Sequence, residues 1–294
     1  MKIKVATFNV NSIKARINNV TKWLKANPID ILLLQEIKCI DEEFCYEQFF
    51  DLGYNSIVYG QKSYNGVAII SKFKPEDVIK GLPDFYEENH FSSKNYSEGE
   101  NLDLFDQIKP SQQSRYIEAA FSINKKVVRV SSIYVPNGGG DKSDNLDITN
   151  SEKFKYKINF FKALRSRLKE VLNYDEISIF GGDFNVALEN IDVFDPLNLD
   201  GQICFHPFEK ENMRSIINLG LTDCYRVLNP KIPGFSWWDY RGNSWQYNKG
   251  MRIDYLLASP LAADKIISCN AEDKGVRDQE KASDHCPVVL EIEV

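Results

Sequence analysis

Polar side chains suited to phosphate or metal chemistry follow the apolar runs of this chain. Asp183 and Asn185 lie in "GGDFNVAL", directly after "ISIF", and Glu36 follows "DILLLQ". The same arrangement recurs at Asn9 and Asn11 after "KVATF", at Asn137 after "SSIYVP", and at Asp284 and His285 before "CPVVL". Because ligand sites in α/β folds form where strand ends meet at one edge of a sheet, we expect these side chains to line one pocket.

Each of these residues also has an ordinary structural interpretation. Asn and Asp are common turn residues, so Asn137 alone would indicate only a turn. Glu36 differs, because a carboxylate at the edge of a buried strand is costly unless it binds a cation. A lone histidine is more often structural, but Asp284 beside His285 makes a pair suited to metal and anion binding. Asp254, in "MRIDYLLAS", could orient that histidine.

The types of side chain in this set indicate which ion it would hold. The set offers carboxylate and amide oxygens, at most one imidazole, and no cysteine cluster. Such ligands suit Mg²⁺ or Mn²⁺ better than zinc. A hard cation among acids, amides and a histidine predicts phosphate-ester chemistry, and the chain has no Walker loop that would indicate nucleotide-driven transfer.

Composition limits the class of protein. The 294 residues are 43% hydrophobic, which predicts a fold with a substantial apolar core. Their formal charge of -6 disfavours a protein that binds polyanions over its whole surface, although a local basic face is still possible. We find no run suited to a signal peptide or a membrane span, and expect a cytoplasmic enzyme. Six scattered cysteines are expected to be reduced thiols: Cys39, Cys45, Cys204, Cys224, Cys269 and Cys286.

Strand and helix patterns alternate from end to end. Strand-like runs such as "IKVATFN", "GVAIIS" and "VVLEIEV" are separated by helical patterns around 17–26, 154–172 and 209–219. With no break in composition, this alternation predicts a single α/β domain over 1–294. The polar segment 84–114 is expected to be a long surface loop, and 137–151 a second loop.

Seven motifs, taken in order, resemble exodeoxyribonuclease III and the related abasic-site (AP) endonucleases. They are "FNVN", "LLLQEIK", "YVPNG", "GGDFN", "WWDYR", "GMRIDYLLAS" and "ASDHCPV", and they extend over essentially the whole chain. The resemblance implies a four-layer α/β sandwich with two mixed sheets between helices. This is the DNase I-like architecture of the endonuclease/exonuclease/phosphatase superfamily.

The resemblance also implies roles for the acids and amides. Asp183 would face the scissile phosphate and activate the attacking water, and Asn185 would polarise that water. Glu36 would be the principal metal ligand, with Asp284 and Asn9 nearby.

Further roles concern the phosphate and the number of metals. His285, oriented by Asp254, would hydrogen-bond the phosphate, and Tyr134 would contact the same group. Tyr134 could instead be a core aromatic and Asn137 a turn residue, but the shared motif favours substrate contact for both. One or two metals are compatible with the resemblance, and the second-site ligands would then be Asp183, Asn185 and His285.

A nuclease of this kind must hold a DNA backbone rather than read its sequence, so a few placed cations suffice. Lys14 and Arg16 follow the first strand, next to Asn11, and Lys38 follows Glu36. Each of the three cations could equally be a solvated surface charge.

A second group of substrate contacts lies near the C-terminus. Trp237, Tyr240, Arg241 and Met251 resemble the wall that accepts a flipped-out sugar. One of the two adjacent tryptophans, Trp237 and Trp238, would then pack in the core.

Together these features predict an enzyme that cleaves the phosphodiester 5′ to abasic sites in double-stranded DNA. It would use Mg²⁺ or Mn²⁺, trim blocked 3′ ends as exonuclease and phosphatase, and act as a monomer. The alternative within the superfamily is a phosphoesterase for another substrate, such as an inositol phosphate. A non-catalytic DNA-binding module is the third interpretation.

Overall fold

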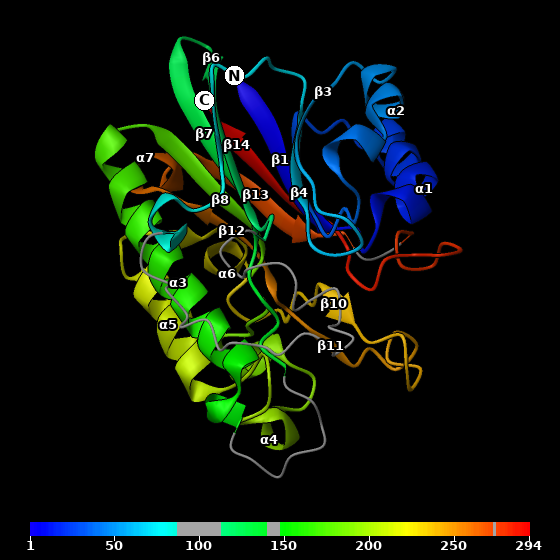
Figure 1. The fold of residues 1–294 in the computed structure, drawn as a ribbon, viewed down its shortest axis with the longest axis vertical. Coiled ribbons are helices and arrows are strands. Elements are labelled where there is room, and N and C mark those ends of the chain that lie inside the picture. The colour runs from blue at the N-terminus through cyan, green and yellow to red at the C-terminus, as the bar shows by residue number, and fades with distance from the viewer. Residues whose placement is uncertain (87–112, 140–147, 273–274) are drawn as a thin grey trace, which may run out of the picture.

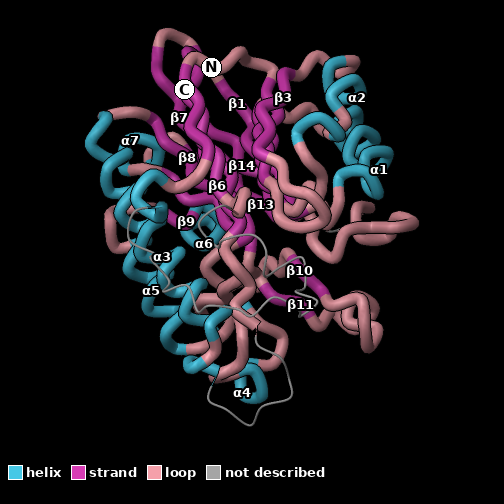
Figure 2. The backbone as a smooth tube through the Cα atoms, in the orientation of Figure 1, coloured by secondary structure: helices cyan, strands magenta, loops and turns pink. Residues whose placement is uncertain are grey.

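The computed structural model describes residues 1–86, 113–139, 148–272 and 275–294. Within these ranges the chain forms two six-stranded sheets and a small two-stranded hairpin. Figures 1 and 2 show the strands in the middle of the molecule, with α1 and α2 on one side and α3 and α5 on the other. Met1 and Val294 lie together, the N-terminal amine donating to the Val294 carbonyl at 2.9 Å.

The first sheet combines the N-terminal and C-terminal parts of the chain. In spatial order its strands are β13 (Ile266–Ala271), β14 (Val288–Glu293), β1 (Lys2–Asn9), β2 (Ile31–Gln35), β4 (Val67–Ser71) and β3 (Asn55–Tyr59). Helix α1 (Ile13–Ala26) connects β1 to β2, which are parallel neighbours. Helix α2 (Tyr46–Phe50) precedes β3.

The second sheet has the same plan. Its order is β5 (Asp77–Lys80), β6 (Tyr116–Ile123), β7 (Lys126–Tyr134), β8 (Ile177–Asp183), β12 (Asp254–Ala258) and β9 (Thr222–Asp223). The parallel pair is β7 and β8, joined through α3 (Glu152–Val171). The remaining elements are α4 (Pro196–Leu199), α5 (Pro207–Ile217), α6 (Cys224–Leu228), α7 (Pro260–Ala263), and the hairpin of β10 (Trp237–Trp238) and β11 (Gly250–Met251).

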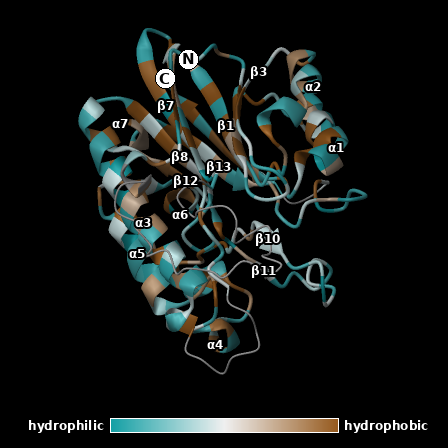
Figure 3. Ribbon diagram, viewed as in Figure 1, coloured by the Kyte–Doolittle hydropathy of each residue, from teal (hydrophilic) through white to brown (hydrophobic). Residues whose placement is uncertain are grey.

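Three apolar clusters hold four layers together. One lies between the sheets, where Leu33 of β2, Val130 of β7 and Leu256 of β12 are all fully buried. The others lie under α1 on the first sheet and under α3 and α5 on the second. Figure 3 shows apolar and polar residues alternating along α3 and α5, as expected for helices that bury one face. This is the predicted four-layer arrangement.

The glycine before the acid motif permits close approach of the two sheets. A Cβ at Gly181 would lie 2.6 Å from Leu33 Cδ1 and 2.6 Å from Leu256 Cδ2. Only glycine fits there without displacing both leucines.

The predicted helices are present with small shifts of their ends. The pattern at 154–172 corresponds to α3, whose N-cap Ser151 accepts a hydrogen bond from Phe154 N. The pattern at 209–219 corresponds to α5, which begins at Pro207. Helix α1 starts four residues before the predicted 17–26, because Ile13 is already fully buried under its first turn.

The expected surface loop at 84–114 is wrong at both ends, and its residues 87–112 lie outside the described part of the chain. Residues Pro83–Tyr86 form a short 3₁₀ turn in which Phe85 is buried, 5.7 Å from the Phe160 ring of α3. At the other end, Gln113 and Ser114 are buried. In the second expected loop, 140–147 are likewise outside the described residues.

Two further expectations concern bonding and membranes. All six cysteines are free thiols, as predicted. Among the described residues, no helix has the length and apolar character needed to cross a membrane.

Strand register brings the predicted polar residues to one edge. Asn9 pairs with Gln35 at the ends of β1 and β2, and Tyr134 pairs with Asp183 at the ends of β7 and β8. Antiparallel β12 begins at Asp254, directly opposite Asp183. Both sheets therefore end in polar side chains at the same edge of the sandwich.

Candidate active site

Asn9 connects two carboxylates across the sheets. Its Nδ2 donates to Glu36 Oε1 at 2.8 Å and to Asp183 Oδ2 at 2.9 Å, and its Oδ1 accepts from Asn11 N at 3.0 Å. The side chain is fully buried, and both ends of its amide have protein partners. Asn9 thus bridges Glu36 and Asp183 and positions both, and its role as a metal ligand stays a prediction.

His285 completes this group from the other side. Its Nδ1 lies 2.9 Å from Asp254 Oδ2, and its Nε2 lies 3.7 Å from Asp183 Oδ2. Ser236, which sequence reasoning missed, donates from its hydroxyl to Asp254 Oδ2 at 2.6 Å. The predicted orienting acid is therefore in contact with the imidazole and is itself held in place.

Burial and charge together set the pKa values of this group. Burial raises the pKa of Asp183 to about 7, against the opposing effect of the His285 charge. Burial lowers the pKa of His285, but the Asp254 and Asp183 carboxylates outweigh it and raise that pKa to about 10. Burial also acts to raise the pKa of Glu36, yet the Lys38 charge and the Asn9 hydrogen bond bring it below its ordinary value. At neutral pH the group therefore combines an imidazolium, an ionised Glu36 and an acid able to exchange a proton.

The same three side chains could hold a metal ion. Glu36, Asp183 and His285 each offer one ligand atom, and these atoms lie within 4.8 Å of one another. All three belong to the predicted ligand set. Of the others, Asp284 accepts from Trp237 Nε1 at its Oδ2 and from Asn11 Nδ2 at its Oδ1, both at 3.0 Å, and its role as a ligand stays a prediction. Two carboxylates and one imidazole form a donor set that fits a divalent cation.

Tyr134 and Asn185 border this cluster. Burial and the Glu36 charge raise the pKa of Tyr134 well above its usual value, so its hydroxyl stays protonated and able to donate. The Arg115 guanidinium lies 4.6 Å from the Tyr134 ring centroid. Asn185 Nδ2 donates to Val135 O at 2.9 Å and to Asp183 Oδ2 at 3.3 Å.

Residues 6–285 match the Endonuclease/Exonuclease/phosphatase family. The chain belongs to this family. It is 28% identical to exodeoxyribonuclease III of Haemophilus influenzae, over 98% of this chain and 99% of the relative.

Two solved structures are similar over 99% of this chain and 100% of their own. An AP endonuclease from Archaeoglobus fulgidus is 34% identical with a TM-score of 0.82. The Neisseria 3′ phosphatase NExo, bound to a product DNA hairpin, is 31% identical with a TM-score of 0.83. The resemblance to exodeoxyribonuclease III and the DNase I-like fold, both predicted from the motifs, are confirmed.

A buried ion pair supports the active-site loops of this family member. Lys157 Nζ donates to Asn137 O at 3.0 Å and to Asn185 O at 2.7 Å, and it pairs with Glu209 of α5. Lys157 and Glu209 are both fully buried. The sequence feature that could have predicted this buried lysine is its position three residues after Phe154, on the apolar face of the predicted helix.

Asn137 and Cys204 contact the side-chain oxygen of Asn185, whose side-chain nitrogen donates to Asp183. Asn137 Nδ2 donates to Asn185 Oδ1 at 3.1 Å. The Cys204 sulfur lies 3.7 Å from that Asn185 oxygen and 3.7 Å from Asn137 Nδ2. Burial raises the pKa of the Cys204 thiol to about 12, so it stays protonated.

Some of the predicted DNA contacts gather beside the cluster. Lys38 Nζ lies 2.7 Å from Glu36 Oε2 and donates to Asn11 Oδ1. Arg16 Nη2 donates to the Tyr240 hydroxyl at 3.1 Å. Asn11, Arg16, Lys38 and Tyr240 therefore form one connected edge.

The other predicted DNA contacts are not part of this hydrogen-bonded group, or they are largely buried. Lys14 pairs with Glu43 on the surface, and Arg241 pairs with Asp239 while remaining 80% exposed. Trp237 is half-buried and faces Met251 across the β10–β11 hairpin, but Met251 is only 5% exposed. Trp238, 1% exposed, is the tryptophan that packs in the core.

Proposed function

We propose that this chain is a metal-dependent DNA repair nuclease. It cleaves the phosphodiester 5′ to abasic sites in duplex DNA and removes blocked 3′ ends. The observation that carries the proposal is the joining of Glu36 and Asp183 by Asn9, with His285 and its Asp254 partner facing them. The similarity to an exodeoxyribonuclease, an AP endonuclease and a 3′ phosphatase supports the choice of DNA as substrate.

The chemistry assigned to the chain's own residues is hydrolysis of a P–O3′ bond. Water attacks phosphorus and gives its proton to Asp183 Oδ2, the P–O3′ bond breaks with its electron pair going to O3′, and O3′ takes a proton from solvent to become the 3′ hydroxyl. His285 Nε2 and the Tyr134 hydroxyl donate to non-bridging phosphate oxygens, where negative charge accumulates. Asn185 fixes Asp183 through two hydrogen bonds, one from its backbone N at 2.8 Å and one from its side chain at 3.3 Å.

We propose Mg²⁺ or Mn²⁺ as the ion. Glu36 would be its principal ligand, with the Asp183 carboxylate in reach, while His285 Nε2 stays with the phosphate. A bound divalent ion would neutralise charge on the phosphate. Outside this core, Trp237 and Tyr240 offer partly exposed side chains that a flipped sugar could contact, while the buried Met251 belongs to the apolar cluster against which Trp237 packs.

Incision of defined substrates tests the proposal. The substrates are a labelled duplex with one tetrahydrofuran abasic analogue, a duplex with a 3′ phosphate at a nick, an undamaged duplex, and an inositol phosphate. Each is incubated with Mg²⁺, with Mn²⁺ and with EDTA. We expect metal-dependent incision 5′ to the lesion and release of the 3′ phosphate.

The controls separate the rival interpretations. Asp183→Asn should lower incision about 10²- to 10⁴-fold, while Asp264→Asn, at the exposed C-cap of α7, should leave it unchanged. Phosphate release from the inositol substrate without DNA cleavage would instead indicate a phosphatase. DNA binding without any hydrolysis would indicate the non-catalytic module.

A further inference from the structure

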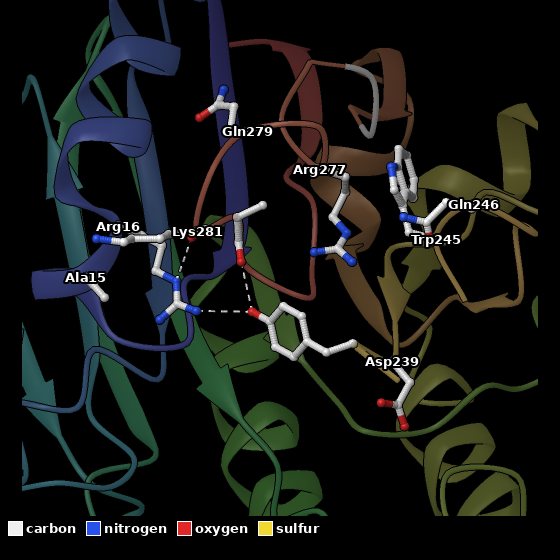
Figure 4. Close-up of a pocket in the computed structure, with 10 residues that line it drawn as sticks. Ala15, Arg16, Asp239, Trp245, Gln246, Arg277, Gln279 and Lys281 are labelled. Carbon is white, nitrogen blue, oxygen red and sulfur yellow. Dashed lines mark hydrogen bonds between the residues drawn. The ribbon is translucent and has the colours of Figure 1, made fainter. Parts of the chain in front are cut away.

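A cavity of about 490 Å³ lies beside the active site, between the start of α1, the loop after β10 and the segment that leads into β14. Figure 4 shows Arg277, Arg16 and Lys281 around it, with Trp245 near Arg277 and Asp239 at its lower edge. None of the roles assigned above uses Arg277, Trp245 or Lys281. The question is what this cavity binds.

Arg277 is a buried cation without a carboxylate partner among the described residues. It is 7% exposed, and its Nη1 donates to the Ser283 carbonyl, but its Nε has no hydrogen-bond partner there. Its guanidinium carbon lies 5.5 Å from the Trp245 ring centroid and 5.7 Å from that of Tyr240. Burial lowers the pKa of Arg277. Since an unpaired buried charge is costly, the site favours an anion that would pair with it.

Two more cations line the cavity, and neither has a carboxylate partner within the described part of the chain. There, Arg16 donates to neutral oxygens: the carbonyls of Lys281 and Asn11 and the Tyr240 hydroxyl. Lys281 is exposed.

The nearby acids do not cancel these charges. Asp239 lines the cavity but pairs with Arg241 at 2.9 Å. Asp278, which accepts from Trp245 Nε1 at 2.8 Å, and Asp284 lie near Arg277 but do not line the cavity. The side chains that line the cavity therefore carry a net positive charge, in a chain of net charge -6.

Tyr240 connects this cavity to the active site. Its hydroxyl donates to Ala282 O at 2.9 Å and accepts from Arg16. Asn11 Nδ2 lies 3.4 Å from the same hydroxyl and donates to Asp284 Oδ1, next to His285 in the chain. A strand whose scissile phosphate meets His285 would thus have neighbouring backbone beside the cavity.

We propose that Arg277, Arg16 and Lys281 bind a second phosphate of the DNA, away from the scissile bond, with Trp245 and Tyr240 flanking it. This inference rests on the proposed nuclease function. The guanidinium supplies charge-assisted hydrogen bonds to the phosphate oxygens, and the contact adds affinity without reading sequence.

Salt-dependent DNA binding tests the inference, measured in an Asp183→Asn background so that the duplex stays intact. Lys281→Glu and Arg277→Met should each weaken DNA affinity roughly tenfold. The plot of log affinity against log salt should become less steep, its negative slope shrinking by about 1. Arg277→Lys should retain part of the affinity, because it keeps the charge and loses the planar fork. Lys126→Glu, an exposed charge reversal in the β6–β7 hairpin, is the matched control.

Several outcomes would overturn the inference. Lys281 is exposed, so Lys281→Glu should not disturb folding. If this variant has unchanged DNA affinity and salt dependence, the cavity does not bind the DNA backbone. Calorimetric binding of inorganic phosphate that Lys281→Glu abolishes, with DNA affinity intact, would assign the cavity to a free anion. Incision of the abasic duplex by the unmodified chain is scored separately, so a failed nuclease proposal would be distinguished from a failed second site.

Discussion

The Asp183 carboxylate occupies the position where the two sheets, the histidine and the proposed water meet. Its Oδ2 accepts from Asn9 and lies 3.7 Å from His285 Nε2, while its Oδ1 accepts from Asn185 N. These contacts fix both oxygens, so the acid needs little reorganisation to take a proton. The role of Asp183 in proton transfer can therefore be tested with a side chain of the same shape that cannot act as a base.

Asp183→Asn keeps the shape and removes the proton acceptor. We expect turnover of the abasic duplex to fall about 10²- to 10⁴-fold, the usual range for loss of a general base. DNA affinity should remain close to that of the unmodified chain. Single-turnover cleavage, with binding measured in parallel, checks this, and near-normal turnover would remove Asp183 from the proton-transfer step.

Glu36→Gln addresses the metal. The amide oxygen can still accept from Asn9, but it lacks the charge that attracts a divalent ion. We therefore expect a higher metal concentration at half-maximal activity, with much of the defect recovered as Mn²⁺ is raised. A metal titration of activity checks this, and a defect equal at every Mn²⁺ concentration would contradict a ligand role.

At the scale of elements, the site depends on support from beneath. Lys157 of α3 and Glu209 of α5 share a buried ion pair, and Lys157 also holds the carbonyls of Asn137 and Asn185. The packing of two helices on the second sheet is thereby coupled to the loops that follow β7 and β8.

Removing one partner of this pair should destabilise the fold and disturb the site. Glu209→Gln leaves Lys157 charged and buried, so we expect a loss of about 3 kcal/mol in the free energy of unfolding. The double change Lys157→Met with Glu209→Met should recover stability but not turnover, because the two loop carbonyls lose their donor. Urea unfolding and single-turnover cleavage of the three proteins check this, and normal turnover in the double variant would show that Lys157 serves stability alone.

The sequence predicts the helices and strands more closely than it predicts which side chains meet in the site. The helix at 154–172 follows from apolar spacing, which is a local property, and α3 agrees with it within two residues at the start and one at the end. The grouping of metal ligands does not follow from local pattern. Asp284 and His285 are adjacent in the chain but have different partners: His285 Nε2 lies 3.7 Å from Asp183 Oδ2, whereas Asp284 Oδ2 accepts from Trp237 Nε1.

Other features needed distant contacts to be recognised. The partners of Arg277 and Lys157 come from segments far apart in the chain, so their burial could not be predicted. The polar composition of 84–114 predicts a loop up to both of its ends, whereas Phe85 packs against α3.

At the scale of the whole molecule, a second buried network holds β12 to the loops around it. Asp192 Oδ1 accepts from Arg252 Nε at 2.8 Å and from Arg226 Nη2, and Arg252 also pairs with Asp223 at 2.8 Å. Asp192 is fully buried and Arg252 is 1% exposed. Since Arg252 lies two residues before Asp254, this network anchors the strand that presents the His285 partner.

The pH dependence of stability tests that anchor. Burial acts to raise the pKa of Asp192, but Arg252 and Arg226 outweigh it, and the pKa lies below its ordinary value. A lowered pKa in the folded state means that Asp192 adds stability above its unfolded pKa of about 3.9, and that this contribution is lost as pH falls through the folded value. Asp192→Asn should therefore cost about 3 to 5 kcal/mol at pH 7. The gap from the unmodified chain should narrow below about pH 4, because protonation then removes the same charge from Asp192. Urea unfolding of both proteins from pH 7 to pH 3 measures the gap, and a constant difference across that range would show that the Asp192 charge is not what stabilises the network.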